Sequence, residues 1–455
     1  MRRRRWSDHR IRHSGPVTHS HLPVDSPEPP SEGVRAQRRR AGRLLSLVLV
    51  PVALATIAGL FVFWPDTAET VARQDATTQV VPGVVFVEAT VLSVEPYDCS
   101  GPDPGPGSPV PATLTCATVV VTIEDGPDAG NSVAVRIPAE VYLAGFDPGD
   151  GLRLQRSRPM DGAPIAYSFS DFSRDTPLTL LAVAFAVAIV AVARIRGLAA
   201  LFGLGFAFFI LVSFMLPGLL NGEPPLWIAL VGSSAIMFVV LYLAHGFSAR
   251  TTTALAGTLF GLALVAGLGA WASGWSRLTG LNSEENLTLT FLTGGVDPAG
   301  IVICGIIVAG LGVLNDVTIT QASAVWQLHE LAPEMPARRL FTSAMAIGRD
   351  HIASTVYTIV FAYAGAALPV LLILETLQRP FLEVVTGEAV AEEVVRTMVG
   401  SIGLVLAVPV TTAIGVLLVK STTRGGVPAG QEPAQTSAKA RGLRTRSGTT
   451  QSEAG

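Results

Sequence analysis

Residues 315–351, NDVTITQASAVWQLHELAPEMPARRLFTSAMAIGRDH, decide the fold of this chain because they join two long apolar segments. The ionisable groups that concern us on the two arms of this stretch are Asp316, Arg349, Asp350 and His351. Pro333 lies midway between the two acids. If both arms are helical and the chain reverses near this proline, the acids lie at similar depth, roughly 25 Å along each arm at 1.5 Å per residue. We therefore predict a helical hairpin with polar groups at one level.

The composition places the chain among integral membrane proteins. It has 455 residues, of which 49% are hydrophobic and 15% are charged. Ordinary soluble domains carry about 25% charged residues. The polytopic all-α membrane class is therefore expected for most of the chain.

Eight apolar stretches are long enough to cross a bilayer as helices. They lie at 44–64, 177–193, 198–217, 226–244, 253–273, 299–326, 351–374 and 397–419. The basic residues between them fall on one side of the predicted membrane, and they are Arg194, Arg196, Arg250, Arg338, Arg339, Lys420 and Arg424. By the positive-inside rule both termini are cytoplasmic.

The remaining segments are polar. Residues 1–42 and 421–455 lack apolar periodicity and are predicted to be disordered cytoplasmic tails. Residues 65–175 contain about five short strand patterns bounded by Gly, Pro and Asp. They predict a small extracytoplasmic β domain, for which an OB-like barrel is the candidate fold, and in which Cys99 and Cys116 are placed to form a disulfide. Cys304 lies in an apolar stretch and is expected in the core.

The polar groups of the hairpin form the candidate site. Residues at three- and four-residue steps along 305–327 share one helical face, and its polar members are Asp316, Thr320, Ser323 and Gln327, with Asn315 beside them. On the second arm Asp350 and Ser354 share a face, flanked by Arg349 and His351. Such faces favour a bundle interior or a water-filled cavity, because lipid does not solvate them.

Three interpretations of these groups compete. Asp316 and Arg349 form a buried pair that locks the hairpin, since intramembrane charges usually pair with one another. Alternatively, Asp316 or Asp350 relays a proton or cation, because burial and a neighbouring arginine shift a carboxyl pKa in opposite directions. A membrane-embedded pair of catalytic acids is the third interpretation. No nucleophile elbow, zinc-binding HExxH motif or phosphate loop supports it, so we do not expect an enzyme.

Several blocks resemble the YibE/F-like family of bacterial multi-pass membrane proteins. They are LAHGFSARTTTALAGTLFG (243–261), LTGLNSEEN (278–286), GLGVLNDVTITQASAVWQLHE (310–330), LFTSAMAIGRDHIASTVYTIVFAYAGAALPVLL (340–372) and AEEVVRTMVGSIGLVLAVPVT (391–411). The resemblance covers about residues 177–420. It implies a plasma-membrane location and a role often taken to be transport, without established catalytic residues.

These observations predict an ion- or proton-coupled transporter, or a transport-associated protein, of the bacterial plasma membrane. Asp316 would be the relay, Arg349 its tuning partner and Asp350 the cytoplasmic gate. The alternative is a sensor or envelope scaffold that acts through the β domain. The expected partners are the lipid bilayer and a small ion or proton, with a homo-oligomer or an envelope partner left open. Acidic residues outnumber basic ones in the β domain, which disfavours a nucleic-acid partner, and no metal or cofactor is expected.

Overall fold

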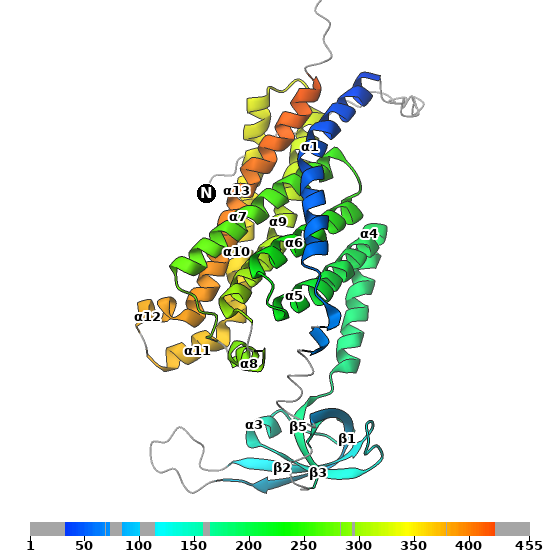
Figure 1. Cartoon of the computed structure of the whole chain (residues 1–455), viewed down its shortest axis with the longest axis vertical. Coiled ribbons are helices and arrows are strands. Elements are labelled where there is room, and N and C mark those ends of the chain that lie inside the picture. Colours follow the sequence, from blue (N-terminus) through cyan, green and yellow to red (C-terminus); the bar gives the residue numbers. More distant parts are fainter. Residues whose placement is uncertain are drawn as a thin grey trace, which may run out of the picture.

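The structure is a computed structural model of the whole chain (Figure 1). It describes residues 32–68, 70–72, 84–100, 114–157, 164–282, 284–293, 296–378 and 380–423. The predicted tails therefore lie mostly outside the described residues. Where the two overlap, residues 32–42 form the start of one helix and residues 421–423 the end of another, in place of the predicted disorder. Arginine is the most frequent residue in 32–42, and both arginine and alanine have high helix propensity.

Helices make up most of the described chain and gather into one bundle (Figure 1). Their bounds are α1 Glu32–Val62, α4 Asp175–Ile210, η1 Leu211–Met215, α5 Leu216–Leu220, α6 Pro225–His245, α7 Ala249–Trp275, α8 Glu284–Thr293, α9 Pro298–Leu331, α10 Ala337–Ala366, α11 Leu368–Thr376, α12 Phe381–Thr386 and α13 Glu388–Thr423. We call the end of the bundle nearest the sheet the sheet end, and the opposite end, where α13 finishes, the far end (Figure 1).

Among the described residues, six helical segments are long and apolar enough to cross a membrane, or seven if a bent pair counts as one span. The chain is thus a multi-pass integral membrane protein, whereas the predicted count of eight is not confirmed. The bent pair is α10 with α11, which meet at 61°. The sequence predicted one span at 351–374 instead. Pro369 in the first turn of α11 explains the break, because proline lacks the N–H that would continue the helix and clashes with the preceding turn.

The other difference concerns the single segment Asp175–Leu220, where the sequence predicted two spans. A straight helix of that length would measure roughly 69 Å, about twice a bilayer core. The backbone leaves the helical region at Arg194, with φ 54° and ψ −129°. A Cβ on Gly197 would lie only 2.6 Å from the carbonyl oxygen of Ile189. Residues eight apart in a straight helix are far too distant for such a contact, so the chain turns sharply at Arg194.

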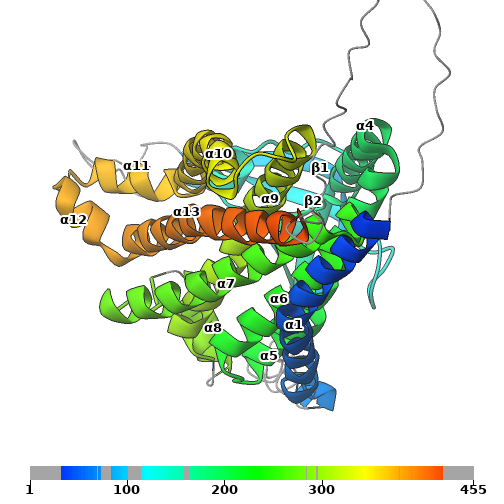
Figure 2. The same cartoon turned by 90° about the horizontal axis from the view of Figure 1, so that it is seen from above.

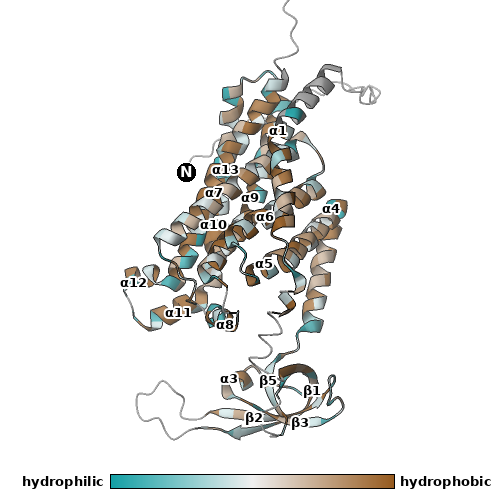
Figure 3. Cartoon of the chain, in the orientation of Figure 1, coloured by the Kyte–Doolittle hydropathy of each residue, from teal (hydrophilic) through white to brown (hydrophobic). Residues whose placement is uncertain are grey.

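The centre of the bundle is formed by α7, α9 and α13, as the view along the bundle shows (Figure 2). Glycines let these helices approach closely. A Cβ on Gly257 of α7 would lie 2.0 Å from Oγ1 of Thr411 on α13, and one on Gly261 would lie 2.6 Å from Leu314 on α9. The hydropathy colouring shows apolar residues along most of the bundle and more polar ones toward its ends (Figure 3).

Five strands between residues 84 and 172 form a separate antiparallel sheet beyond the sheet end (Figure 1). Its strands are β1 Val84–Asp98, β2 Thr115–Ile123, β3 Ser132–Ile137, β4 Gly151–Ser157 and β5 Ala166–Phe172, and a short helix, α3 Ala139–Tyr142, follows β3. The strand order is β3-β2-β1-β4-β5. A disulfide joins Cys99 to Cys116 across the β1–β2 pair. One face holds an apolar core that includes Val87, Val119 and Leu154.

One charged group is buried at the edge of this core. Nε of Arg156 donates to Oδ2 of Asp128 at 2.6 Å, and the Tyr167 hydroxyl donates to the same oxygen. The hydrogen bond to Asp128 raises the pKa of Arg156. Partial burial, and then the hydrogen bond to Asp128, raise the pKa of Tyr167. The contacts tie the loop after β2 to β4 and β5, and they give this cluster a structural role.

Candidate functional site

The hairpin predicted from residues 315–351 is present as α9 and α10, and it brings Asp316 and His351 together. Nε2 of His351 lies 3.5 Å from Oδ2 of Asp316. The His351 side chain is 31% exposed, but that of Asp316 is 68% exposed. The carboxylate therefore lies at the outer side of the α9–α10 contact and not inside the bundle.

The predicted pair of Asp316 with Arg349 is wrong. Arg349 and Asp350 are both exposed, and no ion pair joins either of them to another residue in the described part of the chain. The reason is helical phase, because residues two apart point to opposite sides of a helix. When His351 faces α9, Arg349 points away from it.

The polar face predicted on α9 is real, but it does not face a bundle interior. Asp316, Thr320 and Gln327 are exposed, Ser323 is half-buried, and Ser354 on α10 is exposed as well. The Thr320 hydroxyl donates to the Asp316 carbonyl one turn earlier. The opposite face of α9 carries the large apolar side chains and is the one that packs. Periodicity correctly grouped these residues on one face of α9. Whether that face turns toward the bundle or away from it depends on which side of the helix packs more apolar surface against its neighbours.

The buried polar groups of α9 instead lie on its core face, where sequence reasoning did not place them. Oγ1 of Thr318 lies 2.6 Å from Oγ1 of Thr258 on α7. Nε2 of Gln321 donates to the Ala344 carbonyl of α10 at 3.0 Å and to Oγ1 of Thr412 on α13 at 2.7 Å. The three-residue step between Thr318 and Gln321 was the sequence signal that could have placed these two polar residues on one face of α9. These bonds connect four helices near the far end.

A second charged cluster lies at the sheet end of α13. The Arg396 guanidinium contacts Glu392 and Glu393, each at 2.6 Å. All three side chains are largely buried. Gly305 of α9 faces the guanidinium, since a Cβ built there would lie 3.6 Å from Nη2. The sequence signal for Arg396 was a basic residue three and four positions after two acids in an acidic stretch.

Neighbouring loops fix the position of this cluster. Nδ2 of Asn282 donates to Glu392 at 3.1 Å. One turn earlier, Glu388 accepts from the Thr279 N–H, the Thr279 hydroxyl and the Gly280 N–H, at 2.6, 2.7 and 3.0 Å. These contacts hold the loop after α7 against the start of α13.

We call the junction of α9, α10 and α13 the seam. It extends from the Arg396 cluster to the pair formed by Asp316 and His351. Buried polar atoms without a hydrogen-bond partner occur along it, and they are Glu393 Oε2, Arg396 Nε, Ser401 Oγ and Asn315 Oδ1. His351 Nε2 also lacks a hydrogen bond, although it lies 3.5 Å from Asp316 Oδ2. The middle of the seam is closed by an apolar cluster built from Val317, Ile359, Leu404 and Val408. The seam is therefore polar toward both ends and apolar between them.

The described residues contain no group of three or more His, Cys, Asp or Glu side chains that could hold a metal ion. What the seam offers chemically is proton exchange or weak cation binding at its carboxylates. Cys304 is a free thiol buried in the bundle core, as the sequence predicted.

No curated protein and no solved structure matches the chain. A family model described as YibE/F-like protein matches residues 181–421, which include α6 to α12 in full and nearly all of α4 and α13. This match covers more than half of the chain and contains every residue of the seam. The chain therefore belongs to the YibE/F-like protein family.

Proposed function

We propose that this protein moves protons or a small cation across the bacterial plasma membrane along the seam of α9, α10 and α13. The Arg396 cluster is the extracytoplasmic site, and Asp316 with His351 is the cytoplasmic one. Asp350 and Arg349 are assigned no role in the pathway, because both are exposed and neither forms an ion pair with another described residue. The proposal assigns no catalytic chemistry to the chain.

One observation carries the proposal: the seam contains buried polar atoms that have no hydrogen-bond partner. Leaving a buried polar group unsatisfied costs about 1–3 kcal/mol, and such groups normally bind ordered water or an ion. Unpartnered buried atoms also occur outside the seam, on Ser233, Ser273 and His329, but those of the seam include the carboxylate of Glu393 and the guanidinium of Arg396, for which water or a cation is a suitable partner. Their occurrence toward both ends of one helix junction favours a pathway over isolated packing defects.

The apolar cluster in the middle acts as the gate in this proposal. Ile359 of α10 meets Leu404 and Val408 of α13 there. A layer of this kind blocks water until a helix moves. We assign the movement to α10, since its outer face is exposed and its end is broken at the bend before α11.

The orientation follows from the loop charges. In the proposed topology Arg194, Arg250 and Arg338 lie on the cytoplasmic side, together with both chain termini. The sharp turn at Arg194 supports two crossings in the segment that runs to Leu220. With the bent pair counted as one span, this gives eight crossings and places the sheet outside the cell.

The test is proton flux in proteoliposomes with a pH-sensitive dye inside. We expect Glu393→Gln and Asp316→Asn each to slow the flux by about tenfold or more, which corresponds to roughly 1.4 kcal/mol in the barrier. Asp350→Asn is the matched control, because it removes an exposed carboxylate one residue from His351. It should leave the flux unchanged.

Thermal unfolding in detergent separates a loss of function from a loss of fold. Equal flux in all three variants, or no flux above that of empty liposomes under proton and cation gradients, overturns the proposal. A loss of flux in Asp350→Asn alone contradicts the assignment to the seam.

A sensor or scaffold is the second candidate function, and the sheet is the observation that favours it. The strand order, with α3 between β3 and β4, supports an OB-like barrel, a fold that binds ligands on its strands and loops. Phe86 and Leu92 of β1 are exposed. If the sheet on a foreign anchor restores the function of a deletion strain, this second candidate is correct and transport through the seam is not the required activity.

A further inference from the structure

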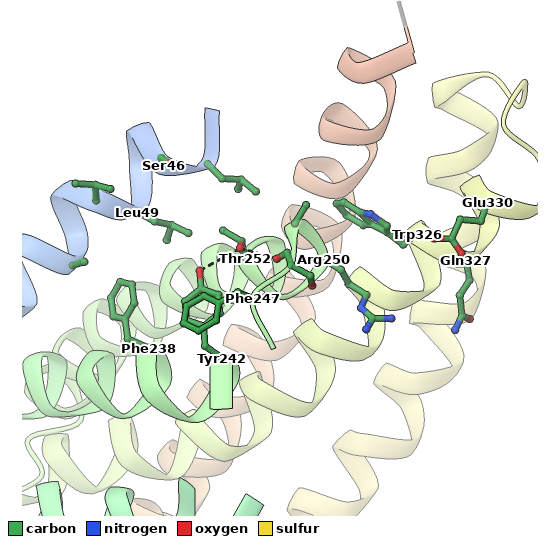
Figure 4. Close-up of a pocket in the computed structure, with 15 residues that line it drawn as sticks. Ser46, Leu49, Phe238, Tyr242, Phe247, Arg250, Thr252, Trp326, Gln327 and Glu330 are labelled. Carbon is green, nitrogen blue, oxygen red and sulfur yellow. Dashed lines mark hydrogen bonds between the residues drawn. The ribbon is translucent and has the colours of Figure 1, made fainter. Parts of the chain in front are cut away.

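Two cavities lie between α1 and the rest of the bundle, away from the seam. The larger has a volume of about 820 Å³ and opens near the far end, where α1, α6, α9 and the start of α7 meet (Figure 4). The second has a volume of about 690 Å³ and lies farther toward the sheet end between α1, α6 and α7. Leu49 of α1 lines both, so the two cavities adjoin. We call them together the α1 crevice.

The shape of α1 explains why the crevice exists. The helix touches α6 closely at Gly59, where a Cβ would lie 2.6 Å from Val231. It contacts the bundle again at Leu45, which packs with Trp326 and Leu418. Pro51 lies between these contacts and removes one helical hydrogen bond, and α1 is visibly bent along its length (Figure 2). Leu49, beside this bend, packs into the bundle core, and the two cavities meet at this residue.

The two cavities differ in chemistry. The larger is lined by Arg250, Gln327 and Glu330 as well as by aromatic rings (Figure 4). The second is lined almost wholly by apolar side chains. Its polar members are Thr56 and Ser234, and the Thr56 hydroxyl donates to the Val52 carbonyl of its own helix. The crevice therefore has a polar end and an apolar end, which match the polar headgroup and the apolar acyl chain of a lipid molecule.

Arg250 gives the polar end its charge. Its side chain is half-buried in the second position of α7, and no described residue forms an ion pair with it. No acidic residue stands in that first turn, so the positive end of the helix dipole adds to the charge of the guanidinium. Glu330 lines the same cavity without bonding to Arg250. A half-buried guanidinium without an ion-pair partner favours an anionic ligand, because arginine forms strong charge-assisted hydrogen bonds with phosphate.

We propose that the α1 crevice binds an anionic, phosphate-bearing amphiphile from the membrane leaflet at the far end. Arg250 binds the phosphate, and an acyl chain follows α1 into the apolar cavity. Basic sites between membrane helices recognise lipid headgroups by the same combination of charge and apolar contact. One wall of the site is α1, which lies outside the residues that match the family model. The site is therefore distinct from the seam and does not depend on the proposed transport.

The test uses the purified full-length protein in detergent and measures its unfolding temperature with added lipid. A ligand that binds the folded protein alone raises this temperature. We expect phosphatidylglycerol to raise it by several degrees, and phosphatidylcholine at the same mole ratio to raise it by less than half as much. Inorganic phosphate, which has the charge without the chain, should have no effect.

Three variants locate the binding site. Arg250→Gln should lose at least half of the phosphatidylglycerol shift, and Arg250→Lys should retain it. Arg349→Gln, which removes an exposed cation elsewhere, should keep the full shift. Ala263→Phe places a ring in the apolar cavity and should reduce the shift without removing any charge.

Each other outcome overturns the proposal. Equal shifts with the two lipids indicate nonspecific solvation, and an equal shift with inorganic phosphate indicates a free-anion site. An unchanged shift in Arg250→Gln places the lipid elsewhere. Arg250→Gln could lower the unfolding temperature before any lipid is added. In that case, native mass spectrometry measures how many lipid molecules each variant retains. Equal retention by Arg250→Gln and Arg250→Lys contradicts the site.

Discussion

At the scale of single residues, the geometry of a helix decides which of several adjacent polar groups acts. Arg349, Asp350 and His351 are consecutive, yet only His351 contacts Asp316. Successive residues point about 100° apart around a helix of 3.6 residues per turn. Sequence alone can place all three near Asp316, but it cannot state which one faces it. That is decided by the rotation of α10 against α9 and α13.

Gly257 illustrates how strictly a buried position can be specified. Its α-carbon faces Thr411 so closely that a methyl group would overlap the hydroxyl oxygen. We predict that Gly257→Ala lowers the stability of the bundle by about 1–3 kcal/mol, the usual range for overpacking. The measurement is thermal unfolding in detergent.

Gly267 on the same helix is the matched control for that prediction, because a Cβ there would meet no atom within 4 Å. Gly267→Ala should be neutral or slightly stabilising, since alanine favours a helix by up to about 1 kcal/mol over glycine. If both variants unfold at the same temperature, α7 and α13 are not packed as described.

At the scale of elements, α4 shows that composition does not reveal a break within a continuous apolar helix. Arg194 has a positive φ, a conformation that costs a residue with a Cβ about 1–3 kcal/mol. Glycine adopts it without that cost. We predict that Arg194→Gly raises the unfolding temperature.

Arg196→Gly provides the comparison for α4, because residue 196 is helical and exposed. Glycine at a helical position loses about 1 kcal/mol relative to good helix formers, so this variant should unfold at a lower temperature. A loss of stability in both variants would mean that α4 is not broken at Arg194.

At the scale of the whole molecule, the proposed topology predicts how often the chain crosses the membrane, and single-cysteine labelling measures this number. Cys99 and Cys116 are bonded to each other and Cys304 is buried, so the native background should be low. With a membrane-impermeant maleimide on intact cells, Asp171→Cys and Glu223→Cys should react. Arg194→Cys should react only after the cells are permeabilised.

Glu334→Cys, in the connection between α9 and α10, tests the same topology independently and should behave like Arg194→Cys. If Arg194→Cys reacts on intact cells to the same extent as Asp171→Cys, the segment before Leu220 does not cross twice. The orientation of the sheet would then need revision, since the alternation of basic loops depends on both crossings.

Sequence by itself determined the class of this protein, most of its membrane segments, the α9–α10 hairpin and the existence of a five-stranded domain. These features follow from local composition and periodicity, which act within one element. The bend at Pro369 carried a proline signal as well, but its angle depends on how α11 packs. The disulfide between Cys99 and Cys116 could also be predicted, because the two cysteines flank one predicted loop.

Only the tertiary structure decided which face of α9 is buried, that Arg396 lies beside Gly305, and that α1 leaves a crevice against α6 and α7. Each of these depends on contacts between segments far apart in the chain, and packing energy is a property of the pair and not of either segment. A polar stripe such as that through Asp316 and Thr320 is compatible with an interior or an exterior position. The apolar area on the opposite side of the helix, which includes Leu314 and Val325, is what turned it outward.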